Sequence, residues 1–102
     1  MLIEMSIKGL MVDPMAGTPI VILKDKQGER VLPIWVGVPE ANAIALQIEN
    51  VSTPRPMTHD LLRNIITDLE GRVDRVVVSG LRDNTYLRII HLAGGGGRVA
   101  VD

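Results

Sequence analysis

The chain has 102 residues, of which 46% are hydrophobic and 23% charged, and its formal net charge at pH 7 is −1. This composition indicates a folded domain and excludes a disordered chain, which would combine few apolar residues with a high net charge. Cysteine is absent, which excludes disulfides, zinc–thiolate sites and cysteine nucleophiles. There is neither a long apolar run nor a signal-peptide pattern, so we expect no membrane association and a cytoplasmic protein. The length predicts a single domain over residues 1–102.

Basic side chains are divided unevenly along the sequence. Residues 1–50 carry four basic and six acidic side chains, whereas residues 51–102 carry seven arginines and six acids. Proteins that bind nucleic acid tightly usually show a strongly basic surface. One tryptophan and one tyrosine are also too few for a base-stacking platform. The composition therefore counts against a tight nucleic-acid binder, but not against an enzyme that holds its substrate briefly.

The first half of the sequence predicts three strands. They cover residues 2–12, 18–24 and 29–36, and polar turns rich in Asp, Pro and Gly separate them. Pro33 has no N–H to donate, so the third strand is expected at a sheet edge or a bulge.

A helix is expected to follow these strands. Pro39 and Glu40 suit its first turn, where backbone N–H groups are free and the helix dipole is positive. The apolar stripe of this helix fades near Asn50 and consists of Ala41, Ile44, Ala45 and Ile48.

The second half predicts another helix and three more strands. Thr58 is the expected N-cap of the helix, and Gly71 is its expected left-handed C-terminal cap. Strands are expected over residues 73–81, 85–92 and 98–101. The expected connections are a tight hairpin at Asp83-Asn84 and a flexible loop at Gly94–Gly97.

These elements suggest an internal repeat. Ile7-Lys8-Gly9-Leu10 followed by Asp13 is similar to Val78-Ser79-Gly80-Leu81 followed by Asp83. Three strands and a helix would then occur twice, with the second copy lacking its helix. We therefore expect an α+β fold with a mixed, strongly curved sheet of about six strands and two helices, truncated at the C-terminus. The sheet face left uncovered predicts a homo-oligomer.

Several segments, in order along the chain, resemble the bifunctional nuclease domain family. They are Asp13-Pro14, Thr18-Pro19-Ile20-Val21, Leu32-Pro33-Ile34-Trp35-Val36-Gly37, Glu40-Ala41 and Pro54-Arg55-Pro56-Met57-Thr58-His59-Asp60-Leu61-Leu62. The resemblance implies a small oligomeric α+β domain that acts on both RNA and DNA. Family members usually continue beyond the equivalent of Asp102 into an Arg-Pro-Ser-Asp segment and an Ala-rich helix, and they carry polar or acidic residues where this chain has Gly94–Gly97. No catalytic residue is carried over from the family.

The candidate catalytic residues are Glu40, Arg55, His59 and Asp60. Metal-dependent nucleases hold a hard cation with clustered carboxylates, so Glu40 and Asp60 are the expected ligands of Mg²⁺ or Mn²⁺, with no organic cofactor. Metal-free nucleases instead use His with Lys or Arg as acid, base and phosphate clamp. If the two helix N-termini that carry these residues meet, they would form a phosphate site.

Each candidate also has a structural interpretation. Glu40 and Asp60 would also complement a helix dipole, His59 would also serve as a hydrogen-bonded junction residue, and Arg55 would also bind a carboxylate. Asp13 and Asp83 are expected in turns, and Trp35 is expected in the core or a subunit interface. Two functions therefore stay open: a nuclease cleaving RNA or DNA with little sequence preference, and an oligomeric interaction module without catalysis.

Overall fold

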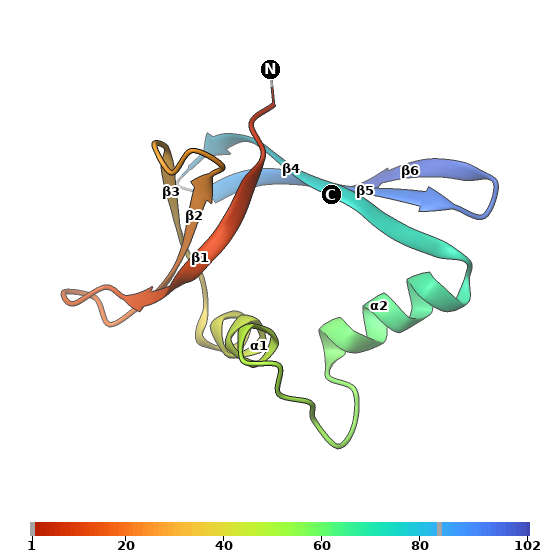
Figure 1. Ribbon diagram of the computed structural model, residues 1–102, viewed down its shortest axis with the longest axis horizontal. Coiled ribbons are helices and arrows are strands. Elements are labelled where there is room, and N and C mark those ends of the chain that lie inside the picture. Colours follow the sequence, from red (N-terminus) through yellow and green to blue (C-terminus); the bar gives the residue numbers. More distant parts are fainter. Residues whose placement is uncertain (1, 84) are drawn as a thin grey trace. The chain divides into compact units, whose positions relative to one another are not determined.

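The structure is a computed structural model that describes residues 2–83 and 85–102 (Figure 1). The chain divides into two compact units, Met1–Pro54 and Arg55–Asp102. The elements in chain order are β1 (Met5–Val12), β2 (Pro19–Asp25), β3 (Val31–Trp35), α1 (Val38–Ile48), α2 (Thr58–Asp68), β4 (Gly71–Arg82), β5 (Thr85–Gly94) and β6 (Gly97–Val101).

The first unit contains a three-stranded antiparallel sheet with β2 in the centre. Its strand β2 contains the apolar run Ile20–Leu23, of which Ile20 and Val21 are buried. Alternate residues of a strand point to opposite faces, so this run has apolar side chains on both faces of the sheet. Helix α1 contacts β2, and its Ala41 is buried. The small Ala side chain allows this close approach.

Pro33 lies in β3, which is an edge strand of this sheet, as the sequence predicted. It is paired with Ile22 of the central strand. An edge strand bonds on one side only, so a missing N–H is tolerated there.

The second unit contains α2 and the sheet β4-β5-β6, also antiparallel. Two expected caps are wrong by one residue. The N-cap of α2 is Met57, and Thr58 is the first helical residue. The left-handed residue after α2 is Glu70, with φ 64°, whereas Gly71 already belongs to β4. Gly71 is favoured for another reason, because a Cβ there would make a tight contact, 3.2 Å from the carbonyl oxygen of Ile66.

The expected α+β class is confirmed, with six strands and two helices. The strands form two three-stranded antiparallel sheets, which differs from the expected single mixed sheet. The physical reason is that paired strands are consecutive in the chain and few residues separate them. Such short connections produce antiparallel pairs, whereas a parallel pair needs a long crossover connection. The expected hairpin at Asp83-Asn84 lies partly outside the described residues.

The two sheets repeat one local irregularity. The pairing of β1 with β2 shifts by one residue between Ile7 and Gly9, and the pairing of β4 with β5 shifts between Val78 and Gly80. These are the positions that the sequence repeat aligns. A β-bulge re-aims the strand, and Gly tolerates its backbone geometry. The shared bulge, together with the shared strand order, supports the internal repeat.

Apolar side chains are incompletely covered in this fold. Among the described residues, no large side chain is fully buried, and the buried apolar set is Ile20, Val21, Ala41 and Ala93. On the first sheet, Met11 and Trp35 flank Ile20 in one cross-strand row and remain 52% and 53% exposed. Neither described helix is long and apolar enough to cross a membrane.

Candidate functional site

The N-terminus of α2 brings two of the candidate residues together. His59 Nε2 lies 3.5 Å from Asp60 Oδ1, and the two side chains are 48% and 25% exposed. The other oxygen of Asp60, Oδ2, accepts a hydrogen bond of 3.1 Å from the backbone N–H of Met57. One carboxylate therefore performs two tasks: it caps the helix and it contacts the imidazole.

The capping contact explains why Asp is placed three residues after Met57. The first N–H groups of a helix have no partner within the helix, and an acidic side chain in the first turn also favours the positive end of the dipole. The structural interpretation of Asp60 is thus confirmed in its local geometry. The contact to His59 leaves the imidazole half exposed, so a solvent-borne substrate can reach it.

Arg55 is also part of the second unit, two residues ahead of Met57. It is exposed and lies between Pro54 and Pro56, each of which fixes its own backbone φ. The paired prolines restrict the backbone from which the guanidinium extends.

Glu40 lies in a different unit from the other candidates. It occupies the first turn of α1 and is exposed. The dipole of α1 favours a carboxylate there, as expected from the sequence. The structure therefore associates His59 with Asp60, places Arg55 in the same unit, and assigns Glu40 to the other.

A divalent cation would need several ligands close together. Mg²⁺ and Mn²⁺ prefer several oxygen ligands, usually including carboxylates. Within residues 2–83 and 85–102, no group of three or more His, Cys, Asp or Glu side chains has the spacing to hold a metal. Asp60 supplies one carboxylate beside one imidazole, which is not a complete ligand set for a hard cation.

A second polar cluster lies in the first unit and was only partly predicted. Asp13 Oδ1 accepts bonds from the backbone N–H groups of Met15, at 2.9 Å, and Ala16, at 3.4 Å, which confirms its expected place in a turn. Its Oδ2 accepts a bond of 3.1 Å from Nε1 of Trp35. These donors, with Met15 first, lower the pKa of Asp13 below its usual value of 3.8. The bond to Trp35 was not predicted from the sequence. Strand register could have indicated it, because Trp35 pairs with Ile20, which follows the turn that Asp13 begins.

Taken together, the fold is a small α+β domain with a His–Asp pair at a helix N-terminus and an arginine shortly before it. The model of the bifunctional nuclease domain matches residues 21–102. This match covers more than half of the chain, so the protein belongs to the bifunctional nuclease domain family.

Two curated relatives were found in Mycobacterium tuberculosis: the uncharacterized protein Rv1829 of strain H37Rv and the uncharacterized protein MT1877 of strain CDC 1551. Each is 39% identical to this chain over 83 residues, which is 81% of the chain. The chain spans 51% of the length of each relative.

Proposed function

We propose that this domain hydrolyses phosphodiester bonds of RNA and DNA with little sequence preference. Membership of the bifunctional nuclease domain family supports the reaction class. The observation that carries the site is the His59–Asp60 contact at the start of α2, 3.5 Å between Nε2 and Oδ1. A base oriented by a carboxylate is a recurring arrangement for activating a nucleophile.

The proposed step uses water as the nucleophile, because DNA has no 2′-hydroxyl group. His59 takes a proton from the water through Nδ1, the water oxygen bonds to phosphorus, and the P–O ester bond breaks. The alkoxide that leaves receives a proton from the imidazolium or from solvent. Asp60 holds the imidazole and favours its charged form during the step.

Charge on the phosphate also has to be neutralised. Arg55 is assigned this role because a guanidinium can donate two parallel hydrogen bonds to phosphate oxygens. The N-terminus of α2, which begins three residues after Arg55, adds free backbone N–H groups and a positive dipole end. The divalent ion expected from the sequence stays a prediction, as does a contribution of Glu40.

The test is a cleavage assay of the purified chain on single-stranded RNA and DNA, with Mg²⁺, with Mn²⁺ and with a chelator. His59→Gln should lower kcat by about 10²–10⁴-fold, the usual effect of losing a general base. Arg55→Gln should lower it by about 10²–10³-fold, as for other lost charge-stabilising donors. The matched controls Asp68→Asn and Arg63→Gln change exposed residues of the same helix and should keep the wild-type rate. Full activity in His59→Gln would contradict the assignment and indicate a contaminating nuclease.

A second function is favoured by a different observation. The Asp60–Met57 capping bond and the many exposed apolar side chains are also what a structural or interaction module would show. Under this alternative the domain docks a partner and performs no chemistry. Both functions are compatible with assembly into a homo-oligomer, in which a second copy would cover rows such as Met11–Ile20–Trp35. The cleavage assay separates the two functions, because an interaction module would show no hydrolysis that depends on His59.

A further inference from the structure

One face of the second sheet carries three arginines close together. Arg72 is paired with Ala93, which is paired in turn with Arg98 on the third strand. Arg75 is paired with His91, two residues before Ala93. Directly opposite residues in antiparallel strands share a face, and so do residues two apart in one strand. Arg72, Arg75 and Arg98, which we call the arginine row, therefore lie on the same face.

The opposite face is apolar. Its cross-strand rows are Val73–Leu92–Val99 and Val76–Ile90–Val101. Helix α2, which precedes β4, lies on this apolar side. Gly71 is on the same face as Val73, and a Cβ added to it would lie 3.3 Å from Cγ2 of Ile66 in α2. The arginine row thus lies on the face of the sheet opposite α2, and its three side chains are exposed.

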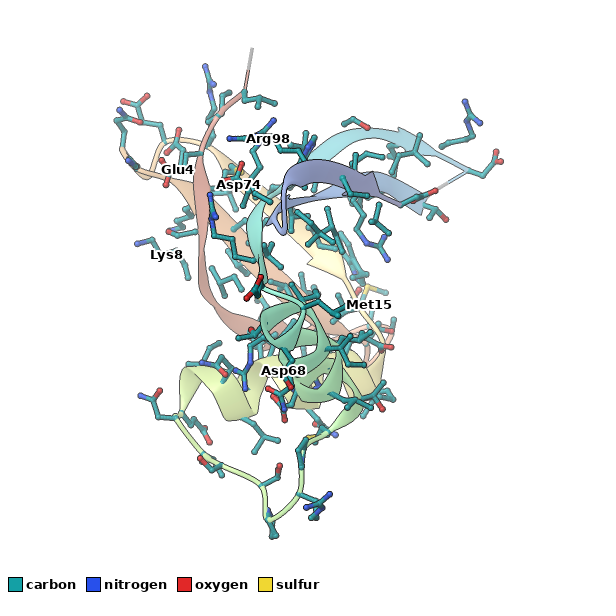
Figure 2. The ribbon with its side chains drawn as sticks, turned by 90° about the vertical axis from the view of Figure 1, so that its right-hand side faces the viewer. Glu4, Lys8, Met15, Asp68, Asp74 and Arg98 are labelled. Carbon is teal, nitrogen blue, oxygen red and sulfur yellow. The ribbon has the colours of Figure 1, made fainter. Side chains whose placement is uncertain are left out.

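The charge of this face is only partly compensated. Asp74, in the bulge between Val73 and Arg75, contacts Arg75 at 3.1 Å. It also contacts Arg98 at 3.6 Å, and Figure 2 labels these two side chains. Arg72 forms no ion pair with any residue in 2–83 or 85–102. One carboxylate faces three guanidinium groups, so the row has an excess of positive charge. Arg98 keeps 75% of its side chain exposed despite its contact to Asp74.

The spacing of the arginine row suits a polyanion. Neighbouring strands lie about 4.8 Å apart, so Arg72 and Arg98, two strands apart, originate about 10 Å from each other. The arginine side chains therefore start from points spread across the sheet, which suits contact with successive phosphates of a chain. Guanidinium groups are permanently charged and match phosphate oxygens in geometry.

We infer that the arginine row binds the phosphodiester backbone of a nucleic acid, and that Asp74 weakens this binding. The inference rests on the proposed function for the identity of the ligand, but not on its catalytic residues. It assigns to the second sheet a holding role that is distinct from the His59–Asp60 pair. A weak, carboxylate-moderated contact agrees with an enzyme that must release its product.

The test is equilibrium binding of fluorescently labelled single-stranded DNA and RNA to the full chain, measured by anisotropy in chelator at low temperature to suppress hydrolysis. The triple variant R72Q/R75Q/R98Q should weaken binding at least about 10-fold at low salt. The slope of log K against log salt should fall in magnitude by about 2, since each lost phosphate contact on a single strand contributes about 0.7. The control R63Q/R82Q/R88Q removes the same charge from other positions of the second unit and should weaken binding less than about 3-fold.

A gain-of-binding variant keeps the test informative even if the triple variant folds poorly. Asp74→Asn removes one negative charge and releases two arginines, so affinity should rise about 3-fold. Equal losses in the two triple variants, no binding by the wild-type chain, or weaker binding by a folded Asp74→Asn variant would each overturn the inference. Inorganic pyrophosphate serves as a competitor: complete displacement at an equal phosphate concentration would indicate a small-anion site and also overturn it. A wild-type chain that binds nucleic acid through the arginine row but cleaves neither RNA nor DNA would instead refute the proposed catalysis alone.

Discussion

The indole N–H of Trp35 donates a hydrogen bond of 3.1 Å to Asp13 Oδ2, which links the end of β3 to the turn between β1 and β2. Twenty-two residues separate the two partners in sequence. The bond fixes the orientation of an indole ring that is still 53% exposed. Trp35 is the only tryptophan in the sequence, so tryptophan fluorescence reports on the surroundings of this one ring.

The Asp13 carboxylate should give this contact a measurable pH dependence. Its pKa in the folded chain is lowered by the hydrogen bonds from Met15, Trp35 and Ala16, given from the largest effect to the smallest. Desolvation has the smallest effect and raises the pKa. A lowered folded-state pKa means that the stabilisation is fully present above the unfolded-state value, near 3.8, and is lost as the pH falls through the folded-state value. We expect a step in Trp35 fluorescence with a midpoint below 3.8, while far-UV circular dichroism checks that the fold persists. The step should be absent in Asp13→Asn and unchanged in Asp83→Asn, and its survival in Asp13→Asn would contradict the assignment.

Removing the helix cap at Asp60 should cost stability. Asp60→Ala leaves the N–H of Met57 without its acceptor and removes a favourable charge from the helix start. The expected loss is about 1 kcal/mol, which corresponds to about 4–8 °C in Tm for a domain of this size. Thermal unfolding followed by circular dichroism measures it. Asp68→Asn is the control: it removes a carboxylate from the C-terminal end of α2, where the dipole disfavours negative charge, so its Tm should be equal or slightly higher.

His59→Gln gives the complementary result. The imidazole contacts Asp60 but is half exposed, so its replacement should change Tm by less than about 2 °C. A fall in kcat at nearly constant Tm would separate a catalytic role from a structural one. A Tm loss as large as that of Asp60→Ala would favour the interaction module instead.

In the glycine-rich hairpin, Gly94 combines a positive φ with a lack of space for a side chain. Gly94 has φ 117°, and a Cβ there would collide with the carbonyl oxygen of Glu70 and lie 2.9 Å from Cα of Gly71. Gly94→Ala should therefore destabilise the chain by about 2–4 kcal/mol, combining backbone strain with a steric clash. Gly97→Ala, in the same hairpin, has open space and an ordinary φ, so we expect a change below about 0.5 kcal/mol. Urea unfolding of the two variants provides the comparison, and equal midpoints would contradict the geometry at Gly94.

Exposed apolar rows should make stability depend on protein concentration. If a second copy covers the row Met11–Ile20–Trp35, Tm should rise with concentration, because association stabilises the folded state by mass action. Light scattering should give a mass above 11.1 kDa, and Trp35→Ser should shift it downward. A monomer at high concentration, with a constant Tm, would refute the homo-oligomer.

Local chemistry predicted most of the secondary structure. The β-branched run of β2 and the Pro-Glu start of α1 were sufficient to place both elements within a few residues. The errors at α2 are one-residue errors of cap geometry. Thr58 has the higher N-cap propensity, yet Met57 is the N-cap. The helix starts where the Asp60 side chain can accept a bond from the backbone N–H of Met57. Glu70 takes the left-handed φ that was expected at Gly71, and Gly71 instead lies where β4 approaches Ile66 closely.

The candidate site was predictable only where its parts are near in sequence. The His59–Asp60 contact follows from adjacency on one helical turn. Glu40 was predicted as a site residue because, like Asp60, it is an acidic residue in the first turn of a helix. A local sequence pattern does not show whether two residues in different units lie close together. The Asp13–Trp35 bond and the arginine row depend on cross-strand register, which a one-residue bulge changes. Sequence periodicity does not place such bulges, so these clusters emerged only from the structure.

The two units also differ in their reactive chemistry. Side-chain amines occur only at Lys8, Lys24 and Lys26, in the first unit, whereas the arginine row belongs to a unit whose cations are all guanidinium groups. An amine-reactive fluorophore would therefore attach outside the second unit and leave its charge intact. A lysine-specific protease would likewise cut no bond after residue 54, so nucleic acid bound to the second unit could be recovered on an uncut fragment.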